Sequence, residues 1–161
     1  AVVQTTLRWA WALLKQRDRE QSLQALMTVN LLAHSKLFRA GVATSGSYNK
    51  TLTPFGFQSE RRSVWEAPEV YTKASPFFFA DKIKAPLLIM HGADDANPGT
   101  TPLQATKLFE AVRGNGGTTR LVMLPFEPHW YTALESNEQL VYEMVTWFYR
   151  HVKNATPRAA Q

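Results

Sequence analysis

Two loops of this sequence carry side chains suited to acid–base chemistry. Asp95 follows the apolar run 86–90, and His129 follows the apolar run 119–124. A carboxylate beside a histidine accepts an imidazole N–H, fixes the ring tautomer and stabilises the protonated ring. Each residue also has an ordinary structural interpretation: a loop aspartate is commonly a turn former, and a lone histidine is commonly a surface or core residue. The two residues are therefore a candidate pair whose meaning depends on the elements that carry them.

The two apolar runs before these loops are predicted to be strands of one parallel sheet. With a short strand at 41–44, the order after residue 40 is strand, long excursion, strand, helix, strand, helix. Buried apolar strands that alternate with helices are typical of α/β proteins, in which helices cover a mostly parallel sheet. Functional residues in such sheets gather at the carboxyl ends of the strands. We therefore expect Asp95 and His129 on the same rim of neighbouring strands.

Helices are predicted from apolar spacing and capping patterns. Segments 2–16 and 22–36 both show helical periodicity. In the second segment one face is expected to be apolar, comprising Leu26, Val29, Leu32 and Ala33. Thr101 is the expected N-cap of a third helix, and Ser136 that of a last one. The excursion 49–80 is read as loop with short helices at 61–66 and 68–73.

Composition indicates one globular domain and excludes several functions. Of the 161 residues, 45% are apolar and 19% are charged, which is typical of a folded chain. No apolar run approaches the roughly 20 residues that cross a bilayer, so no membrane association is expected. The net charge of +5 comes from scattered basic residues, so nucleic-acid binding is not expected either. Without cysteine, the chain has no disulfides, thiolate catalysis or cysteine zinc sites.

Beyond these patterns, residues 25–152 resemble the catalytic domain of the prolyl oligopeptidase family of serine peptidases. Within that family the resemblance is closest to the glutamyl endopeptidases of plant chloroplasts and their bacterial relatives. It is carried by MTVNLLAHSKLFRAGVATSGSYNKTLTPFGFQSERRSVWEAPEVY, SPFFFADKIKAPLLIMHGADDANPGT and RLVMLPFEPHWY. The resemblance implies an α/β fold that is the C-terminal half of an α/β-hydrolase, with a short, mostly parallel sheet flanked by helices and a helical N-terminal segment.

The resemblance also implies an activity and a set of site residues. The implied activity is hydrolysis of peptide bonds through a Ser-Asp-His triad, with glutamyl endopeptidase activity suggested and no metal or organic cofactor. Asp95 aligns with the triad acid, His129 with the triad histidine and Ser22 with the nucleophile. The backbone N–H of Leu23 would be the oxyanion donor. By the same resemblance we expect the cytoplasm or the plastid stroma.

Two departures from the family pattern stand beside these residues. Glu20 and Gln24 occupy the places of the two glycines that flank the nucleophile. The nucleophile elbow is a sharp strand-to-helix turn in which glycines avoid collisions with neighbouring backbone. The alternative to a nucleophile is that Ser22 is an ordinary helix residue or a helix cap. Trp130 follows the histidine where the relatives have glycine, and either shields the imidazole or blocks the substrate.

Substrate contacts, boundaries and partners complete the expectations. Arg61 and Arg62 are candidates to bind a substrate glutamate, since a guanidinium holds a carboxylate bidentately, and a solvated pair beside Glu60 is the alternative. Asn97 and Trp130 are further substrate-binding candidates. We expect a divergent helical segment at 1–24, the peptidase part at 25–153 and a flexible tail at 154–161. The partners expected are a peptide substrate and a second copy of the chain, paired through an exposed sheet edge. The alternative function is an inactive hydrolase remnant that acts as an interaction module.

Overall fold

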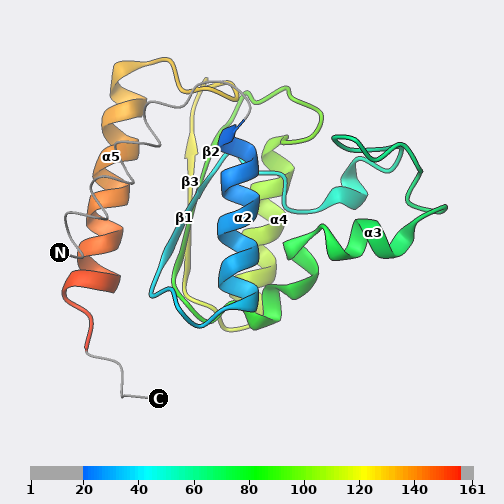
Figure 1. Ribbon diagram of the computed structural model, residues 1–161. Helices are drawn as coiled ribbons and strands as arrows, with labels where there is room; N and C mark the ends of the chain where they lie inside the picture. The colour runs from blue at the N-terminus through cyan, green and yellow to red at the C-terminus, as the bar shows by residue number, and fades with distance from the viewer. Residues whose placement is uncertain (1–19, 157–161) are drawn as a thin grey trace.

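Three parallel strands form the centre of the molecule. The computed structural model describes residues 20–156, so the predicted helix at 2–16 lies outside the described residues. The strands are β1 (Gly41–Thr44), β2 (Leu87–Gly92) and β3 (Thr119–Leu124), in the order β1-β2-β3 (Figure 1). Both neighbouring pairs are parallel. The predicted parallel sheet is confirmed.

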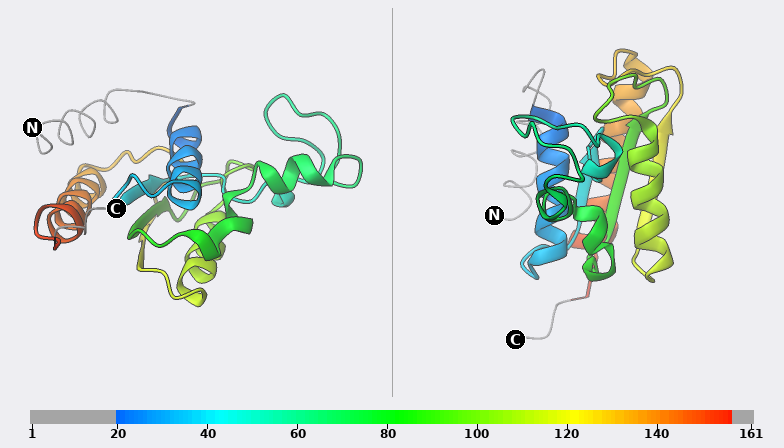
Figure 2. Two further views of the ribbon diagram at one scale, coloured as in Figure 1. Left: turned by 60° about the horizontal axis from the view of Figure 1, so that its bottom comes forward. Right: turned by 90° about the vertical axis from the view of Figure 1, so that its right-hand side faces the viewer.

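Helices cover both faces of this sheet. Helices α2 (Glu20–His34) and α4 (Pro102–Gly114) lie on one face, and α5 (Leu134–Phe148) lies on the other (Figures 1 and 2). A π-helical turn, η3 (Tyr149–Lys153), continues α5. The central strand β2 is buried along its whole length, as its continuous apolar run predicts. No helix of the described part of the chain is long and apolar enough to cross a membrane.

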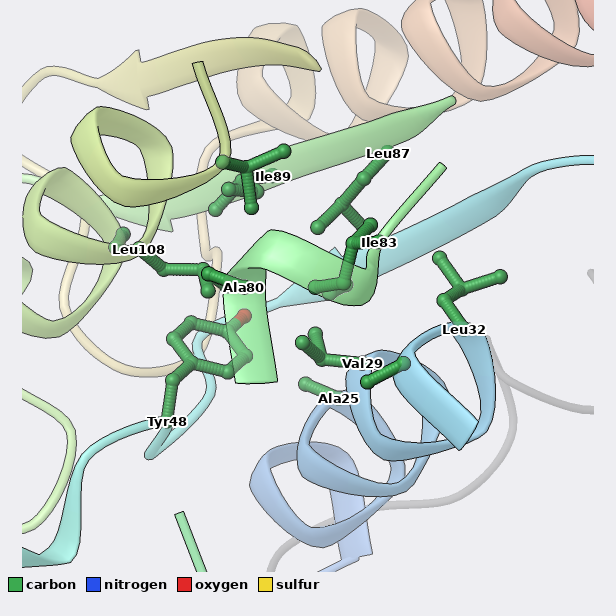
Figure 3. Close-up of a cluster of buried hydrophobic side chains, with 13 residues drawn as sticks. Ala25, Val29, Leu32, Tyr48, Ala80, Ile83, Leu87, Ile89 and Leu108 are labelled. Carbon is green, nitrogen blue, oxygen red and sulfur yellow. The ribbon is translucent and has the colours of Figure 1, made fainter. Parts of the chain in front are cut away.

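Alternate side chains of β2 divide the core into two layers. Leu87 and Ile89 pack toward α2 and α4, whereas Leu88 and Met90 pack toward Leu140 and Trp147 of α5. This division follows from the two-residue period of a strand. Figure 3 shows the first layer, in which Leu87 and Ile89 meet residues of α2, of α4 and of the segment between β1 and β2. The apolar face predicted for α2 is buried at all four positions, Leu26, Val29, Leu32 and Ala33.

The excursion between β1 and β2 contains three short helices, and one predicted helix is absent. The short helices are η1 (Lys50–Leu52), α3 (Pro68–Lys73) and η2 (Pro76–Lys82). Residues 61–66, predicted to be helical, form turns instead. The carboxylate of Glu66 accepts hydrogen bonds from both the backbone N–H and the hydroxyl of Ser63, at 2.7 Å each. Such local side-chain bonds compete with helix formation.

One predicted helix cap is confirmed in position and the other is wrong. Thr101 is the N-cap residue of α4 and Pro102 follows it at the first helical position, although the Thr101 side chain makes no capping hydrogen bond. Helix α5 begins at Leu134, so Ser136 lies inside its first turn rather than before it. The reason is a carboxylate outside the helix, Glu127, which binds the backbone just before α5.

Candidate active site

The acid loop and the histidine loop leave the sheet side by side. The acid loop joins β2 to α4, and the histidine loop joins β3 to α5 (Figure 1). The Ala93 N–H donates to the Leu124 carbonyl at 2.8 Å, and the Asp94 N–H donates to the Glu127 carbonyl at 2.9 Å. Gly92 allows this approach, because a Cβ atom there would collide with the carbonyl oxygens of Glu127 and Pro128. Both loops are therefore held together by backbone contacts.

Asp95 and His129 form a direct hydrogen bond at this rim. The distance between Asp95 Oδ2 and His129 Nδ1 is 2.7 Å. The Asp95 side chain is fully buried, and 10% of the His129 side chain is exposed. The second ring nitrogen of His129, Nε2, has no hydrogen-bond partner among the described residues. This is the geometry in which a carboxylate orients a histidine that acts as a base.

Three further donors hold the Asp95 carboxylate. His91 Nε2 and the Thr100 hydroxyl each lie 3.0 Å from Oδ2, and the Asn97 N–H donates to Oδ1 at 2.9 Å. Burial acts to raise the pKa of Asp95. The hydrogen bonds from His129, His91 and Asn97 outweigh it and hold the pKa of Asp95 well below its usual range. Asp95 is therefore an ionised carboxylate.

Glu127 shapes the loop that presents His129. Its carboxylate accepts the backbone N–H groups of Thr132 and Ala133, at 2.6 and 3.0 Å, and so binds the N-terminal approach to α5. Burial acts to raise the pKa of Glu127, but these bonds and others from Ser136 and Thr132 lower it overall. A negative charge also suits the N-terminal end of a helix. Along the chain His129 lies between Glu127 and Thr132, so it belongs to the loop that these hydrogen bonds close.

Two aromatic residues follow His129 in its loop. The Trp130 ring lies edge-on to the His129 ring, with centroids 4.6 Å apart and planes at 81°. Tyr131 connects the same loop to β1 through a 3.1 Å hydrogen bond between its hydroxyl and Ser45 Oγ. Burial raises the pKa of Tyr131 above its usual range. Trp130 is therefore in direct contact with the imidazole of His129.

The predicted nucleophile lies near the start of α2. Helix α2 begins at Glu20 in the described residues, so Ser22 is helical, and its side chain is half-buried. Figure 1 shows this end of α2 at the rim where the strands finish. In the described part of the chain no hydrogen bond joins Ser22 to His129. Leu23, the predicted oxyanion donor, lies in the same helical turn.

The predicted substrate-binding residues differ in whether their side chains are already paired. Arg62 is paired with Glu60, with Nε and Nη2 at 2.9 and 2.6 Å from the two carboxylate oxygens. The hydrogen bond from Arg62 lowers the pKa of Glu60 to about 2. Arg61 is exposed. Asn97 is exposed too, and it shapes the acid loop by accepting the Gly99 N–H at 3.0 Å.

Sequence reasoning missed four residues that organise the site. His91 and Thr100 hold Asp95, and Glu127 holds the histidine loop. Gln104 of α4 joins the loop after β1 to the acid loop, through bonds to the Asn49 backbone and to the Gly99 carbonyl. The only signal in the sequence was the position of His91 and Glu127 beside strand ends. No group of three or more His, Cys, Asp or Glu between residues 20 and 156 is arranged to hold a metal.

A parallel sheet with helices on both faces is the fold of an α/β-hydrolase. In solved structures the chain is similar to the acylaminoacyl peptidase of Pyrococcus horikoshii (TM-score 0.74, 24% identity), covering 89% of this chain and 26% of that one. It is also similar to the dipeptidyl peptidase 4 of Porphyromonas gingivalis (TM-score 0.71, 16% identity), covering 80% of this chain and 18% of that one. The chain belongs to the prolyl oligopeptidase family, which it matches over residues 22–155.

Curated relatives show higher sequence identity. The chain is 50% identical over 131 residues to the probable chloroplastic glutamyl endopeptidase of Arabidopsis thaliana, which covers 81% of this chain. The rice protein of the same description gives the same identity and coverage. The chain spans 14% of the length of each of these relatives.

Proposed function

We propose that this chain carries the acid and the base of a serine peptidase and takes part in the hydrolysis of peptide bonds. The observation that supports this best is the 2.7 Å hydrogen bond between Asp95 and His129 Nδ1, with Nε2 left without a partner in the described residues. His129 would take the proton of the attacking hydroxyl and return it to the leaving amine. Asp95 would orient His129 and stabilise the imidazolium. The reaction needs no metal ion in this scheme.

The proposed nucleophile is Ser22. Its hydroxyl would attack the substrate carbonyl, form an acyl-enzyme and be released by water. The backbone N–H of Leu23 would donate to the oxyanion that forms in this step. Ser22 lies in the first described turn of α2, and this end of α2 lies at the rim where the strands finish (Figure 1), which supports this role.

Peptides that contain glutamate are the proposed substrates. The two chloroplastic relatives are described as probable glutamyl endopeptidases. Of the two arginines considered for the substrate carboxylate, Arg62 already binds Glu60 on both oxygens. Arg61 is therefore the better candidate, because no carboxylate of the described residues is paired with it. Asn97 and Trp130 flank the pair Asp95–His129 and would contact the peptide beside the cleaved bond.

The alternative is a hydrolase remnant that acts through binding. The observation in its favour is that α2 is already helical at Glu20, two residues before Ser22, where an elbow would have a turn. Such a remnant would present its sheet edge to a second copy of the chain. For either function we propose the plastid stroma or the cytoplasm as the compartment, following the descriptions of the chloroplastic relatives.

Labelling with a fluorophosphonate probe tests the proposal. We expect the intact chain to be labelled, and labelling to be lost in Ser22→Ala and in His129→Ala. Ser35→Ala, just past the other end of α2, is the matched control and should be labelled like the wild type. Absence of labelling in a chain shown to be folded by circular dichroism would favour the remnant. Labelling that survives Ser22→Ala would reject Ser22 as the nucleophile.

A further inference from the structure

We infer that His91 is a positioning residue that holds the Asp95 carboxylate toward His129, with its own ring in the tautomer opposite to that of His129. The inference rests on the proposed function of Asp95 and His129. His91 is the last residue but one of β2, and its side chain is fully buried. Its Nε2 lies 3.0 Å from Asp95 Oδ2, the same oxygen that His129 contacts. Two imidazoles therefore share one carboxylate oxygen.

The protonation of the acid determines where the hydrogen of His91 lies. The pKa of Asp95 is held well below its usual range, chiefly because the hydrogen bonds it accepts outweigh the effect of burial. An ionised carboxylate only accepts hydrogen bonds, so the ring nitrogen that faces it must carry the hydrogen. In His91 that nitrogen is Nε2. A neutral imidazole has one N–H, which leaves His91 Nδ1 bare.

The surroundings of His91 Nδ1 agree with this assignment. This atom is buried and has no hydrogen-bond partner among the described residues. A hydrogen on Nδ1 would be a buried donor without an acceptor, and a second proton would add a buried charge there. His91 is therefore neutral when it holds Asp95.

The same reasoning assigns His129 the opposite tautomer. Its Nδ1 faces Asp95 at 2.7 Å and carries the hydrogen, so Nε2 is the bare nitrogen that can accept a proton. His129 is partly exposed, whereas the His91 side chain is not. Of the two histidines that contact Asp95, His91 is therefore a buried hydrogen-bond donor and His129 is the accessible base.

His91 and Thr100 together restrict the carboxylate. The Thr100 hydroxyl donates to Asp95 Oδ2 from the acid loop, and His91 Nε2 donates to the same oxygen from β2. With the Asn97 N–H on Oδ1, these donors oppose rotation of the carboxylate away from His129. Loss of the His91 donor would free Asp95 to move, and the His129 Nδ1 hydrogen would then exchange with water more rapidly.

Nuclear magnetic resonance of the full chain labelled with ¹⁵N-histidine tests the inference. In the wild type we expect His91 to have a protonated Nε2 and a bare Nδ1, and His129 to have the reverse. A His129 Nδ1–H signal well downfield of the amide region should also be present. In His91→Leu, which removes the donor, this signal should be lost through exchange. In His91→Gln, whose amide N–H replaces Nε2–H, it should remain.

Each outcome of this experiment decides the inference. A hydrogen on His91 Nδ1 in the wild type would overturn it, and so would a His129 signal unchanged by His91→Leu. If His91→Leu does not fold, the tautomers of the two histidines in the wild type test the inference. Thr100→Val then adds a second measurement, because loss of the Thr100 hydroxyl should also accelerate exchange of the His129 Nδ1 hydrogen. Probe labelling separates this inference from the proposed function. If the chain is not labelled but His91 and His129 show the expected tautomers, the inference holds and the proposed peptidase activity does not.

Discussion

Gly92 allows the loop that carries His129 to pack closely against the end of β2. It ends β2, and its missing side chain lets the carbonyl groups of Glu127 and Pro128 pack against the strand end. Those carbonyls immediately precede His129. A side chain at residue 92 would push the histidine loop away from the loop that carries Asp95.

We expect Gly92→Ala to destabilise the fold and to separate the pair. The added methyl group overpacks rigid backbone, so the free energy of unfolding should fall by about 1–3 kcal/mol in urea denaturation. Gly114→Ala is the matched control. A Cβ atom at Gly114 meets nothing within 4 Å. Because Gly114 is the last residue of α4, alanine there should stabilise by roughly 0.5–1 kcal/mol. Equal effects of the two substitutions would contradict this account.

At this scale the sequence indicated the two residues of the candidate pair but not the residues that hold them. Asp95 and His129 were identified by their position after apolar runs, and the structure brings them together, while their catalytic roles stay predictions. The contacts of His91 and Thr100 depend on how the acid loop folds back onto Asp95. That loop closure leaves no periodic pattern in a single sequence, so reasoning from spacing could not find it.

At the scale of elements, the start of α5 is controlled by a residue outside the helix. Glu127 accepts the N–H groups of Thr132 and Ala133, the two residues that precede α5. The sequence pattern around Ser136 predicted a cap inside the segment instead. Strands and helix faces were predicted well, because their burial is periodic, whereas caps depend on side chains that arrive from other loops.

Replacing Glu127 with glutamine should make this part of the fold less sensitive to acid. The pKa of Glu127 is lowered on folding, so its contribution to stability is present above the pKa of an unfolded glutamate and is lost as the pH falls. At neutral pH, Glu127→Gln should reduce the free energy of unfolding by about 1.5–3 kcal/mol, the range for hydrogen bonds to charged groups. The difference from wild type should shrink once the pH falls below roughly 4.3.

Denaturation in urea at several pH values measures this effect. The control is Glu69→Gln, because Glu69 is exposed and only faces Lys73 on the surface of α3, at 3.3 Å. Exposed pairs of this kind contribute little to stability. A difference between Glu127→Gln and wild type that is constant with pH would show that the charge of Glu127 plays no part.

At the scale of the whole molecule, a three-stranded sheet leaves two outer edges. In the described residues no strand pairs with the outer side of β1 or of β3. Next to β1, α2 exposes three apolar side chains at helical spacing, Leu23, Met27 and Leu31, each between 41% and 48% exposed. An open edge beside an apolar stripe favours association.

We therefore expect the chain to self-associate as its concentration rises. Light scattering after size-exclusion chromatography should show a mass above that of one chain, and replacing both Met27 and Leu31 with glutamate should restore the monomer. Leu103→Glu is the control, because Leu103 is equally exposed on α4. A wild type that remains monomeric at every concentration would contradict the proposed pairing through this edge.

The overall architecture was predictable because two kinds of information agreed. The alternation of buried strands and helices predicted a parallel sheet, and the family resemblance predicted which half of a hydrolase this is; the fold and the family bear out both. The region before Ala25 was harder to predict, because the family pattern is weak there. Residues 1–19 also lie outside the described part of the chain, so the structure does not test what was predicted for them. The nucleophile falls at this boundary and stays a prediction.

The hydrogen bonds of the acid and the base all lie within one stretch of chain. Every described partner of Asp95 and His129 belongs to the unit that runs from β2 to α5. The candidate acid and base are therefore contained in a single contiguous βαβα module, which does not include the helix that carries Ser22. Such a module can be inherited, duplicated or fused as one piece without its acid and base losing each other.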